Sequence, residues 1–294
     1  MRLAAALGLA ACSIAAGCGG SSSAQEEPDA PTLEALWRAP GEDVSIVPGV
    51  SDFGPGTVRF TFLVVDGQGR VVTRPTAKIW LARALKSKPF AQTTATAEPI
   101  GVAGSEPGEA QEILVARLQL DEPGTYWLLA EPVGGRKIQA LGNVVVKDEP
   151  AAPDVGERAI ASETPTLENA TLEELTTSTR VDRELYRSSV AGALAAKSPF
   201  VVVFATPKYC TSRTCGPVVD VVSTVRQRQD AGVRFIHVEI YEDNDPTKGE
   251  NRWVREWKLP SEPWVFVVGA DGRIRDRFEG TVSVRELDAA VARI

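Results

Sequence analysis

The sequence predicts two domains of different class, an all-β domain followed by an α/β domain. Between residues 33 and 147, short segments alternate apolar and polar side chains and are separated by turns that contain Gly and Pro. This alternation is typical of half-buried strands. After residue 167, continuous apolar runs such as FVVVFA (200–205) alternate with segments of helical period. At 294 residues and 43% hydrophobic composition, the chain is long enough for two cores.

The first domain, residues 33–147, contains about seven predicted strands, the number found in an immunoglobulin-like sandwich. The strands are expected at 44–47, at both ends of 58–72, and at 76–83, 112–120, 125–132 and 138–146. No cysteine pair could join the two sheets, and no cluster of titratable residues stands out in this domain. We therefore expect a spacer or docking module rather than a catalytic unit.

The second domain, residues 167–294, is expected to alternate helices and strands. Helices are predicted at 180–196, 216–229, 252–259 and 283–294, and strands at 200–205, 233–240, 263–269 and 273–280. The order α-β-α-β-α-β-β-α predicts a mixed central sheet with helices on both sides.

The N-terminus resembles the signal of a bacterial lipoprotein. Arg2 precedes a short apolar run, and Ile14 to Cys18 matches a lipobox, which implies a signal peptide at 1–17 and lipid on Cys18. A second possible box ends at Cys12, and an ordinary cleaved signal is the alternative. Residues 18–32 are expected to form a flexible tether, and residues 148–166, rich in Pro and charge, a linker. The expected location is the cell envelope, anchored to a membrane on its extracytoplasmic side.

Composition argues against several function classes. The net charge is −7 and both signs are interspersed, so neither nucleic acid nor a basic membrane-binding helix is indicated. His237 is the single histidine and lies inside an apolar strand, so a Ser-His-Asp hydrolase cannot be assembled.

Cys210 and Cys215 lie five positions apart, after an apolar strand and before an amphipathic helix. In an oxidising compartment such a pair persists as a disulfide, and four intervening residues allow the two Cα atoms to reach the usual span. At a helix N-terminus, unpaired N–H groups and the helix dipole lower the pKa of a thiol. Lys208 and Arg213 would act the same way, so Cys210 is expected to be the reactive thiol and Cys215 the resolving one.

Residues from about 165 to 294 resemble the thioredoxin-like superfamily. Phe204 is similar to the phenylalanine of the strand that leads to the redox loop, and Tyr209 to the aromatic residue before the first cysteine. Pro217 is similar to the proline of the active-site helix. WKLPSEPWVFVV (257–268) is similar to the stretch that contains the family's cis-proline, which would be Pro263.

The resemblance implies a catalytic pair, Cys210 and Cys215, beside a groove for extended protein substrates. The backbone of Glu262 would pair with the substrate there, and Tyr209, Pro263 and Trp264 would line the groove. The sequence departs from the family in its Cys-x4-Cys spacing and in Val203, which stands where the family has a buried aspartate.

Three interpretations of the pair remain open: redox exchange, a structural disulfide, and a metal site. Some thioredoxin-like envelope proteins bind copper through two loop cysteines and a distant histidine. Here His237 is expected in the core and Met1 is lost with the signal, so no metal and no cofactor is expected.

The function predicted from these residues is that of a membrane-tethered thiol–disulfide oxidoreductase of the cell envelope. Its expected partners are protein thiol or disulfide clients and an electron donor or acceptor of the envelope, with the membrane reached through the lipid. The alternative is a non-enzymatic binding or assembly protein in which the disulfide is structural.

Overall fold

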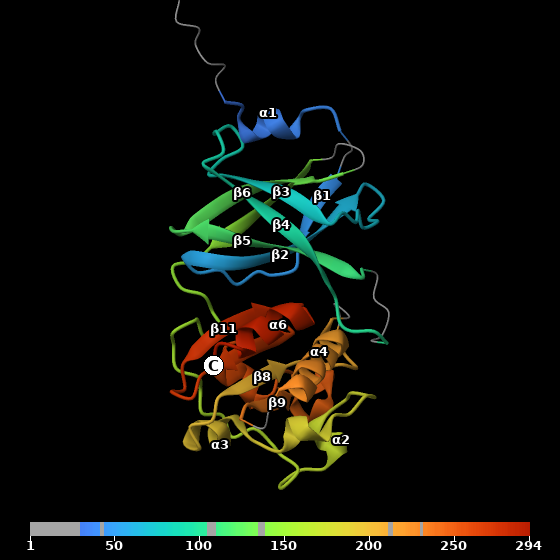
Figure 1. Cartoon of the computed structure of the whole chain (residues 1–294), viewed down its shortest axis with the longest axis vertical. Coiled ribbons are helices and arrows are strands. Elements are labelled where there is room, and N and C mark those ends of the chain that lie inside the picture. The colour runs from blue at the N-terminus through green and yellow to red at the C-terminus, as the bar shows by residue number, and fades with distance from the viewer. Residues whose placement is uncertain (1–29, 42–43, 105–109, 135–138, 211–213, 230–231) are drawn as a thin grey trace, which may run out of the picture. The chain divides into compact units, whose positions relative to one another are not determined.

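A computed structural model describes residues 30–41, 44–104, 110–134, 139–210, 214–229 and 232–294 (Figure 1). The chain divides into two units, residues 1–30 and 31–294, and all the described helices and strands belong to the second. The predicted signal peptide, Cys12 and Cys18 lie outside the described residues, so lipidation stays a prediction. Within the described ranges, no helix is long and apolar enough to span a membrane.

Seven strands of the first half close into a barrel. They are β1 (Val44–Pro48), β2 (Gly56–Asp66), β3 (Thr76–Ala82), β4 (Ala91–Pro99), β5 (Glu112–Leu120), β6 (Gly124–Pro132) and β7 (Ala140–Val146). Their order around the barrel is β1-β2-β5-β4-β3-β6-β7. All pairs are antiparallel except the closing one, where β1 and β7 pair in parallel at Ser45 and Leu141.

The barrel core is formed by alternate residues of each strand. In β2, Phe60, Phe62 and Val64 are at most 1% exposed. The rings of Phe60 and Phe62 stack with centroids 5.1 Å apart. Because side chains of a strand alternate between its faces, an apolar residue at every second position is sufficient to fill the interior.

The second half is built on a four-stranded sheet with the order β11-β10-β8-β9. The strands are β8 (Phe200–Phe204), β9 (Arg234–Val238), β10 (Trp264–Val268) and β11 (Ile274–Glu279). β8 and β9 are parallel, whereas β10 runs antiparallel to both β8 and β11.

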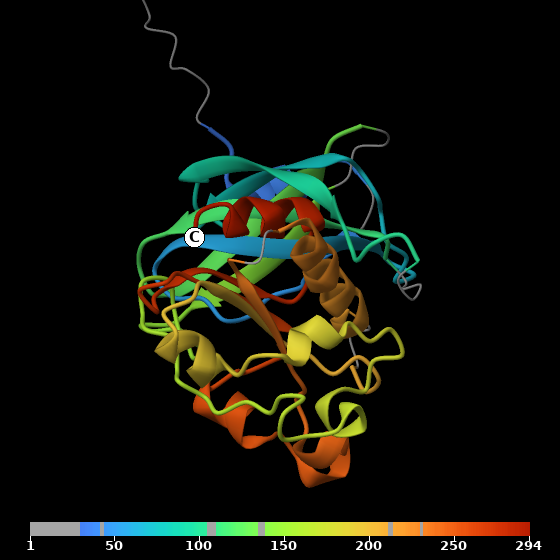
Figure 2. The ribbon, with the colours of Figure 1, turned by 60° about the horizontal axis from the view of Figure 1, so that its bottom comes forward.

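The helices are mostly short. They are α1 (Leu33–Trp37), α2 (Leu172–Leu175), α3 (Val190–Ala195), α4 (Cys215–Arg228), α5 (Arg252–Glu256) and α6 (Val284–Val291), with 3-10 turns η1 (Arg183–Tyr186), η2 (Glu242–Asn244) and η3 (Pro246–Lys248). The longest described helix, α4, lies beside α6, as Figure 2 shows.

Both faces of β8 are buried. Val201 and Val203 join a cluster with α4 and α6, whereas Phe200, Val202 and Phe204 join a second cluster with α3 and α5. All five residues are 0% exposed, which explains why the segment is a continuous apolar run. The loop that follows β8 carries Cys210.

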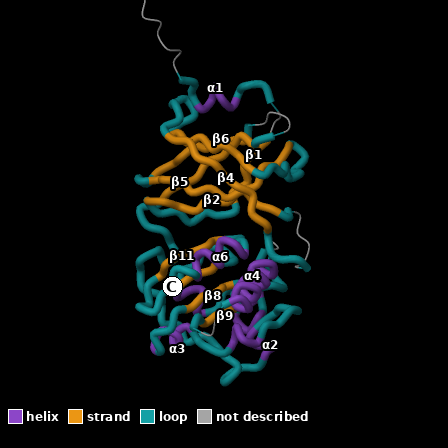
Figure 3. The backbone as a smooth tube through the Cα atoms, in the orientation of Figure 1, coloured by secondary structure: helices purple, strands orange, loops and turns teal. Residues whose placement is uncertain are grey.

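The predicted fold class, an immunoglobulin-like sandwich followed by an α/β thioredoxin-like fold, is wrong. The described chain is mostly β, a closed seven-stranded barrel plus a four-stranded sheet, with few helices (Figure 3). The sandwich fails because β1 also pairs with β7, which closes the sheet. In the second half, the helix expected at 180–196 is reduced to the 3-10 turn η1 and the six-residue α3.

The segment predicted to be a linker, 148–166, packs against the four-stranded sheet. Ala152 is 2% exposed and belongs to the apolar cluster that contains Phe266. The amide of Ala159 donates to the carbonyl of Gly272 at 2.9 Å, and Ser162 is 1% exposed. A segment with these contacts is a structural part of the second half rather than a flexible connection.

Asp52 and Arg277 form the centre of a buried polar network. Asp52 accepts hydrogen bonds from the amides of Ala151 and Ala152 at 2.8 and 3.1 Å and from the Arg277 guanidinium at 2.9 Å. Burial alone would raise the pKa of Asp52, but these amides and Arg277 together lower it below its usual value. The Asp52 carboxylate is therefore ionised and compensated, which makes Arg277 a structural residue.

Candidate active site

Cys210 and Cys215 form a disulfide at the start of α4. Their Cα atoms are 5.9 Å apart, within the usual span for a disulfide. The first cysteine lies in the loop after β8, and the second is the first residue of α4. Residues 211–213 between them, including Arg213, lie outside the described residues.

The two sulfurs are in different environments. Cys215 is 0% exposed and packs among valines of α4 and β8, whereas Cys210 is half-buried. The amide of Cys215 donates a hydrogen bond to Sγ of Cys210 at 3.3 Å. Thr214, the N-cap, makes no side-chain cap hydrogen bond to the helix. This environment favours negative charge on the Cys210 sulfur.

An open cleft of about 500 Å³ lies beside Cys210. Its lining residues come from the segment before η1, the loop after β8 and the first turns of α4: Thr177, Ser178, Thr179, Arg180, Pro207, Lys208, Cys210, Gly216, Pro217 and Asp220. Cys210 lines this cleft and Cys215 does not. A nucleophile in the cleft would therefore meet Cys210 first.

The wall of the cleft is held by Glu239, which directly follows β9. Its carboxylate accepts hydrogen bonds from the amide and hydroxyl of Thr177 at 2.5 and 2.9 Å. The same hydroxyl accepts from the amide of Lys208 at 3.2 Å. These contacts join the Thr-rich wall to the loop that carries Cys210 and fix the width of the cleft.

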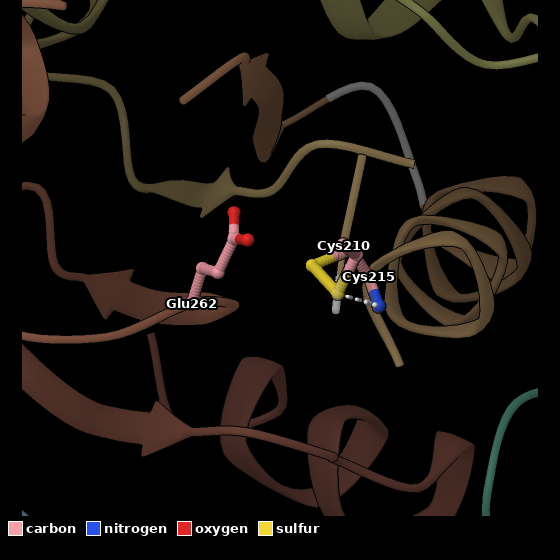
Figure 4. A group of neighbouring side chains, drawn as sticks. All are labelled: Cys210, Cys215 and Glu262. Atoms are coloured by element: carbon pink, nitrogen blue, oxygen red, sulfur yellow. Dashed lines mark hydrogen bonds between the residues drawn. A yellow bond between two sulfur atoms is a disulfide. The ribbon is translucent and has the colours of Figure 1, made fainter. Parts of the chain in front are cut away.

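Glu262, just before β10, has its carboxylate near the disulfide. One oxygen of its carboxylate and the two Sγ atoms all lie within 4.8 Å of one another, and Figure 4 shows the Glu262 side chain beside the disulfide. The Oε2 atom of Glu262 is buried and makes no hydrogen bond to any residue that the structure describes. Burial, followed by the charges of Glu239 and Glu250, raises the pKa of Glu262 to about 7.

Three side chains lie close enough in space to hold one metal ion: Cys210, Cys215 and Glu262. A disulfide does not offer the thiolate charge on which soft metals depend, so the oxidised pair is a poor ligand set. His237 does not complete it. The His237 ring is 3% exposed, with Nδ1 2.7 Å from the Tyr186 hydroxyl and Nε2 3.0 Å from the carbonyl oxygen of Ala205. A carbonyl only accepts, so Nε2 carries the proton and Nδ1 accepts from Tyr186.

Of the residues expected to line a substrate groove, Tyr209 is half-buried, and its ring contacts Tyr241 edge-on at 6.4 Å. The Glu262–Pro263 peptide bond is cis, as expected. Trp264 was also expected to line the groove, but it is fully buried, with 0% of its surface exposed. Its ring stacks on Phe266 and its indole N–H donates to Ser261 at 3.1 Å, so it is a core residue. Pro263 is buried as well.

Two parts of the site were not predicted from the sequence. The cleft wall at 177–180 is a Ser- and Thr-rich segment that carries no motif. The sequence pattern assigns a role to the backbone of Glu262 and none to its carboxylate. An acidic residue at the start of a fully apolar strand was the available signal, since such a residue is rarely buried without a partner.

Comparison with protein-family models and with curated proteins finds no match for this chain. The resemblance of residues 165–294 to the thioredoxin-like superfamily therefore stays a prediction.

Proposed function

We propose that this chain is a thiol–disulfide oxidoreductase that exchanges the Cys210–Cys215 disulfide with cysteines of client proteins. The observation that carries the proposal is the asymmetry of the pair. One sulfur lines an open cleft at a helix N-terminus, and the other is fully buried behind it. Such an arrangement directs a client to one sulfur and leaves the second to resolve the mixed disulfide.

The exchange takes two steps, and electrons and protons balance in each. A client thiolate attacks Sγ of Cys210, the Cys210–Cys215 bond breaks, and Cys215 leaves as a thiolate that takes up a proton. A second client thiolate then attacks the mixed disulfide and releases Cys210, so two electrons pass from the client dithiol to the pair. The reverse sequence reduces a client disulfide. An envelope partner that is itself a dithiol or a disulfide would restore the starting state.

The compartment proposed for this exchange is the cell envelope. Lipid on Cys18 would anchor the protein, and an oxidising space would keep the pair as a disulfide between turnovers. The barrel would hold the site away from the membrane or dock a partner.

A structural disulfide in a non-enzymatic binding protein is the second candidate. The observation in its favour is the complete burial of Cys215 among valines. The two candidates differ in the reduction potential of the pair, since structural disulfides have potentials below about −300 mV.

Trapping tests the proposal. In a Cys215→Ser variant, a mixed disulfide through Cys210 cannot be resolved and should accumulate in envelope preparations, where it appears as an adduct that dithiothreitol removes. Cys210→Ser is the matched control, because its remaining thiol is buried and should capture little. Equal capture by both variants, or by neither, would reject the oxidoreductase.

A further inference from the structure

We propose that Glu262 is the acid–base residue of the pair, giving a proton to Sγ of Cys215 when the disulfide opens and taking it back when the disulfide forms. The inference rests on the proposed exchange and names the group that moves its proton.

The geometry of the carboxyl group is the first argument. An oxygen of Glu262 lies within 4.8 Å of both sulfurs, a distance that one water molecule or a small movement of the side chain bridges. In the oxidised state the Oε2 atom is buried and has no hydrogen-bond partner within the described part of the chain. A buried polar atom without a partner is costly, and a new S–H or thiolate next to it would supply one.

The need for a proton is the second argument. Cys215 is 0% exposed and belongs to an apolar cluster, so a thiolate formed there by opening of the disulfide would have little solvation. Val203, in the same cluster, offers no proton. His237 is committed through both ring nitrogens to Tyr186 and Ala205. Among the described residues, Glu262 is the acidic side chain grouped with the two sulfurs.

The surroundings of Glu262 keep its carboxyl group available as a donor. Among the residues that the structure describes, the ionisable groups that interact with it are Glu239, Glu250 and Tyr241, together with the cysteine pair. Two acidic neighbours and burial oppose its ionisation and raise its pKa to about 7. A group that titrates near neutral pH can both give and accept a proton there.

The proton is exchanged between Glu262 and Cys215, so the proton balance needs no other group. As a thiolate opens the disulfide at Cys210, the electron pair of the S–S bond goes to Cys215, and the proton passes from the carboxyl of Glu262 to that sulfur. In the reverse direction, the Glu262 carboxylate removes the proton from the Cys215 thiol. The resulting thiolate attacks Cys210 and releases the client thiolate.

The test is reduction of the full-length protein by dithiothreitol between about pH 5 and pH 9, with rate constants corrected for the dithiothreitol thiolate. In the wild type, the corrected rate constant should fall as pH rises through about 7 and Glu262 loses its proton. Glu262→Gln should lower the plateau below that pH by about 100-fold, the lower end of general acid catalysis, and should abolish the inflection. Glu262→Asp should recover part of the rate and keep an inflection.

Glu250→Gln is the matched control, since it removes the same charge from an exposed neighbour. It should keep the rate and move the inflection to lower pH, because Glu250 contributes to the raised pKa of Glu262. An unchanged rate and inflection in Glu262→Gln would overturn the inference. The probe is a small dithiol, so this result is independent of whether Cys215→Ser traps a client. Failure of trapping rejects the proposed function, and failure of the pH profile rejects the role of Glu262.

Discussion

The amide of Cys215 donates a hydrogen bond to Sγ of Cys210 at 3.3 Å, so the first N–H group of α4 already points at the sulfur that lines the cleft. The same amide would stabilise a thiolate on Cys210 after reduction, because a hydrogen bond to the charged form favours that form. Cys215 has no comparable exposure, since its side chain is fully buried. The two thiols of the reduced protein should therefore react at different rates.

The first prediction is selective alkylation of the reduced protein. At about pH 6, iodoacetamide should label Cys210 at least about tenfold faster than Cys215, because both thiolate character and exposure favour Cys210. Mass spectrometry of the labelled peptides over time measures both rates. Equal and slow labelling of the two cysteines would contradict the asymmetry on which the proposal depends.

The second prediction concerns stability and the ionisation of Glu262. Its pKa rises from an ordinary value of 4.5 to about 7 on folding, so its contribution to stability is complete below pH 4.5 and is lost as pH rises through 7. Glu262→Gln removes this loss, so the oxidised variant should gain stability relative to the wild type as pH rises from 5 to 8. Urea unfolding at several pH values measures the difference. A constant difference across this range would mean that Glu262 ionises normally.

The third prediction concerns His237, whose ionisation reduces the stability of the protein at acid pH rather than at alkaline pH. Burial lowers the pKa of His237 below its ordinary value of 6.5, so its contribution to stability is complete above that pH and is lost as pH falls below it. His237→Gln should reduce the decline in stability between about pH 6.5 and pH 5. The comparison is best made in the Glu262→Gln background, where the opposing titration is absent. An acid decline as steep in the double variant as in Glu262→Gln alone would exclude His237 as its source.

The fourth prediction concerns Arg277. Arg277→Met leaves the Asp52 carboxylate, which is 0% exposed, without its guanidinium partner. Breaking a buried pair costs about 3 kcal/mol or more when the remaining charge is left alone. Lys147 stays 3.3 Å from the Asp52 carboxylate, so the expected loss of unfolding free energy is about 2 kcal/mol, the value of a hydrogen bond to a charged group. Arg275→Met is the matched control on the same strand, because its bridge to Asp271 is exposed and should cost less than about 1 kcal/mol. Similar losses in the two variants would show that the buried network does not stabilise the protein.

Much of the secondary structure could be predicted because burial leaves a pattern in the sequence. The strand β8 was predicted from a continuous apolar run, and it is buried on both faces. β4 was missed because its sequence, AQTTATAEP, alternates alanine with polar residues and contains no large apolar side chain. A strand at 70–72 was predicted, but there Val71 forms only an isolated bridge to Val65.

The fold class was predicted wrongly for a physical reason. Alternation shows which face of each strand is buried, but it does not show which strands are neighbours, so an open sandwich and a closed barrel give the same pattern. The barrel closes through one parallel bridge, between Ser45 and Leu141, which no local signal marks. The helix expected at 180–196 was predicted too long. Its apolar periodicity continues across Asp182 and Ser189, but each of these residues caps a separate short element, η1 and α3.

The candidate site, like the fold, could be predicted only in part from the sequence. The cysteine pair and Pro263 are visible in the sequence because their types and spacing are unusual. Trp264 was placed in a groove, although an aromatic residue at the start of a buried strand packs in the core. The Glu262 carboxylate lies near the sulfurs because β10 pairs with β8, the strand that leads to Cys210. These residues are about 50 positions apart, a relationship that no spacing rule contains.

The reduction potential of the Cys210–Cys215 pair tests the central claim most directly. Equilibration of the folded protein with dithiothreitol or glutathione buffers, followed by acid quenching and thiol counting, measures it. A redox-active pair should be reduced in the folded state and should have a potential above about −300 mV, in the range of disulfides that exchange. A potential below that value, with a disulfide that dithiothreitol opens only when the protein unfolds, would contradict the account and leave a structural disulfide.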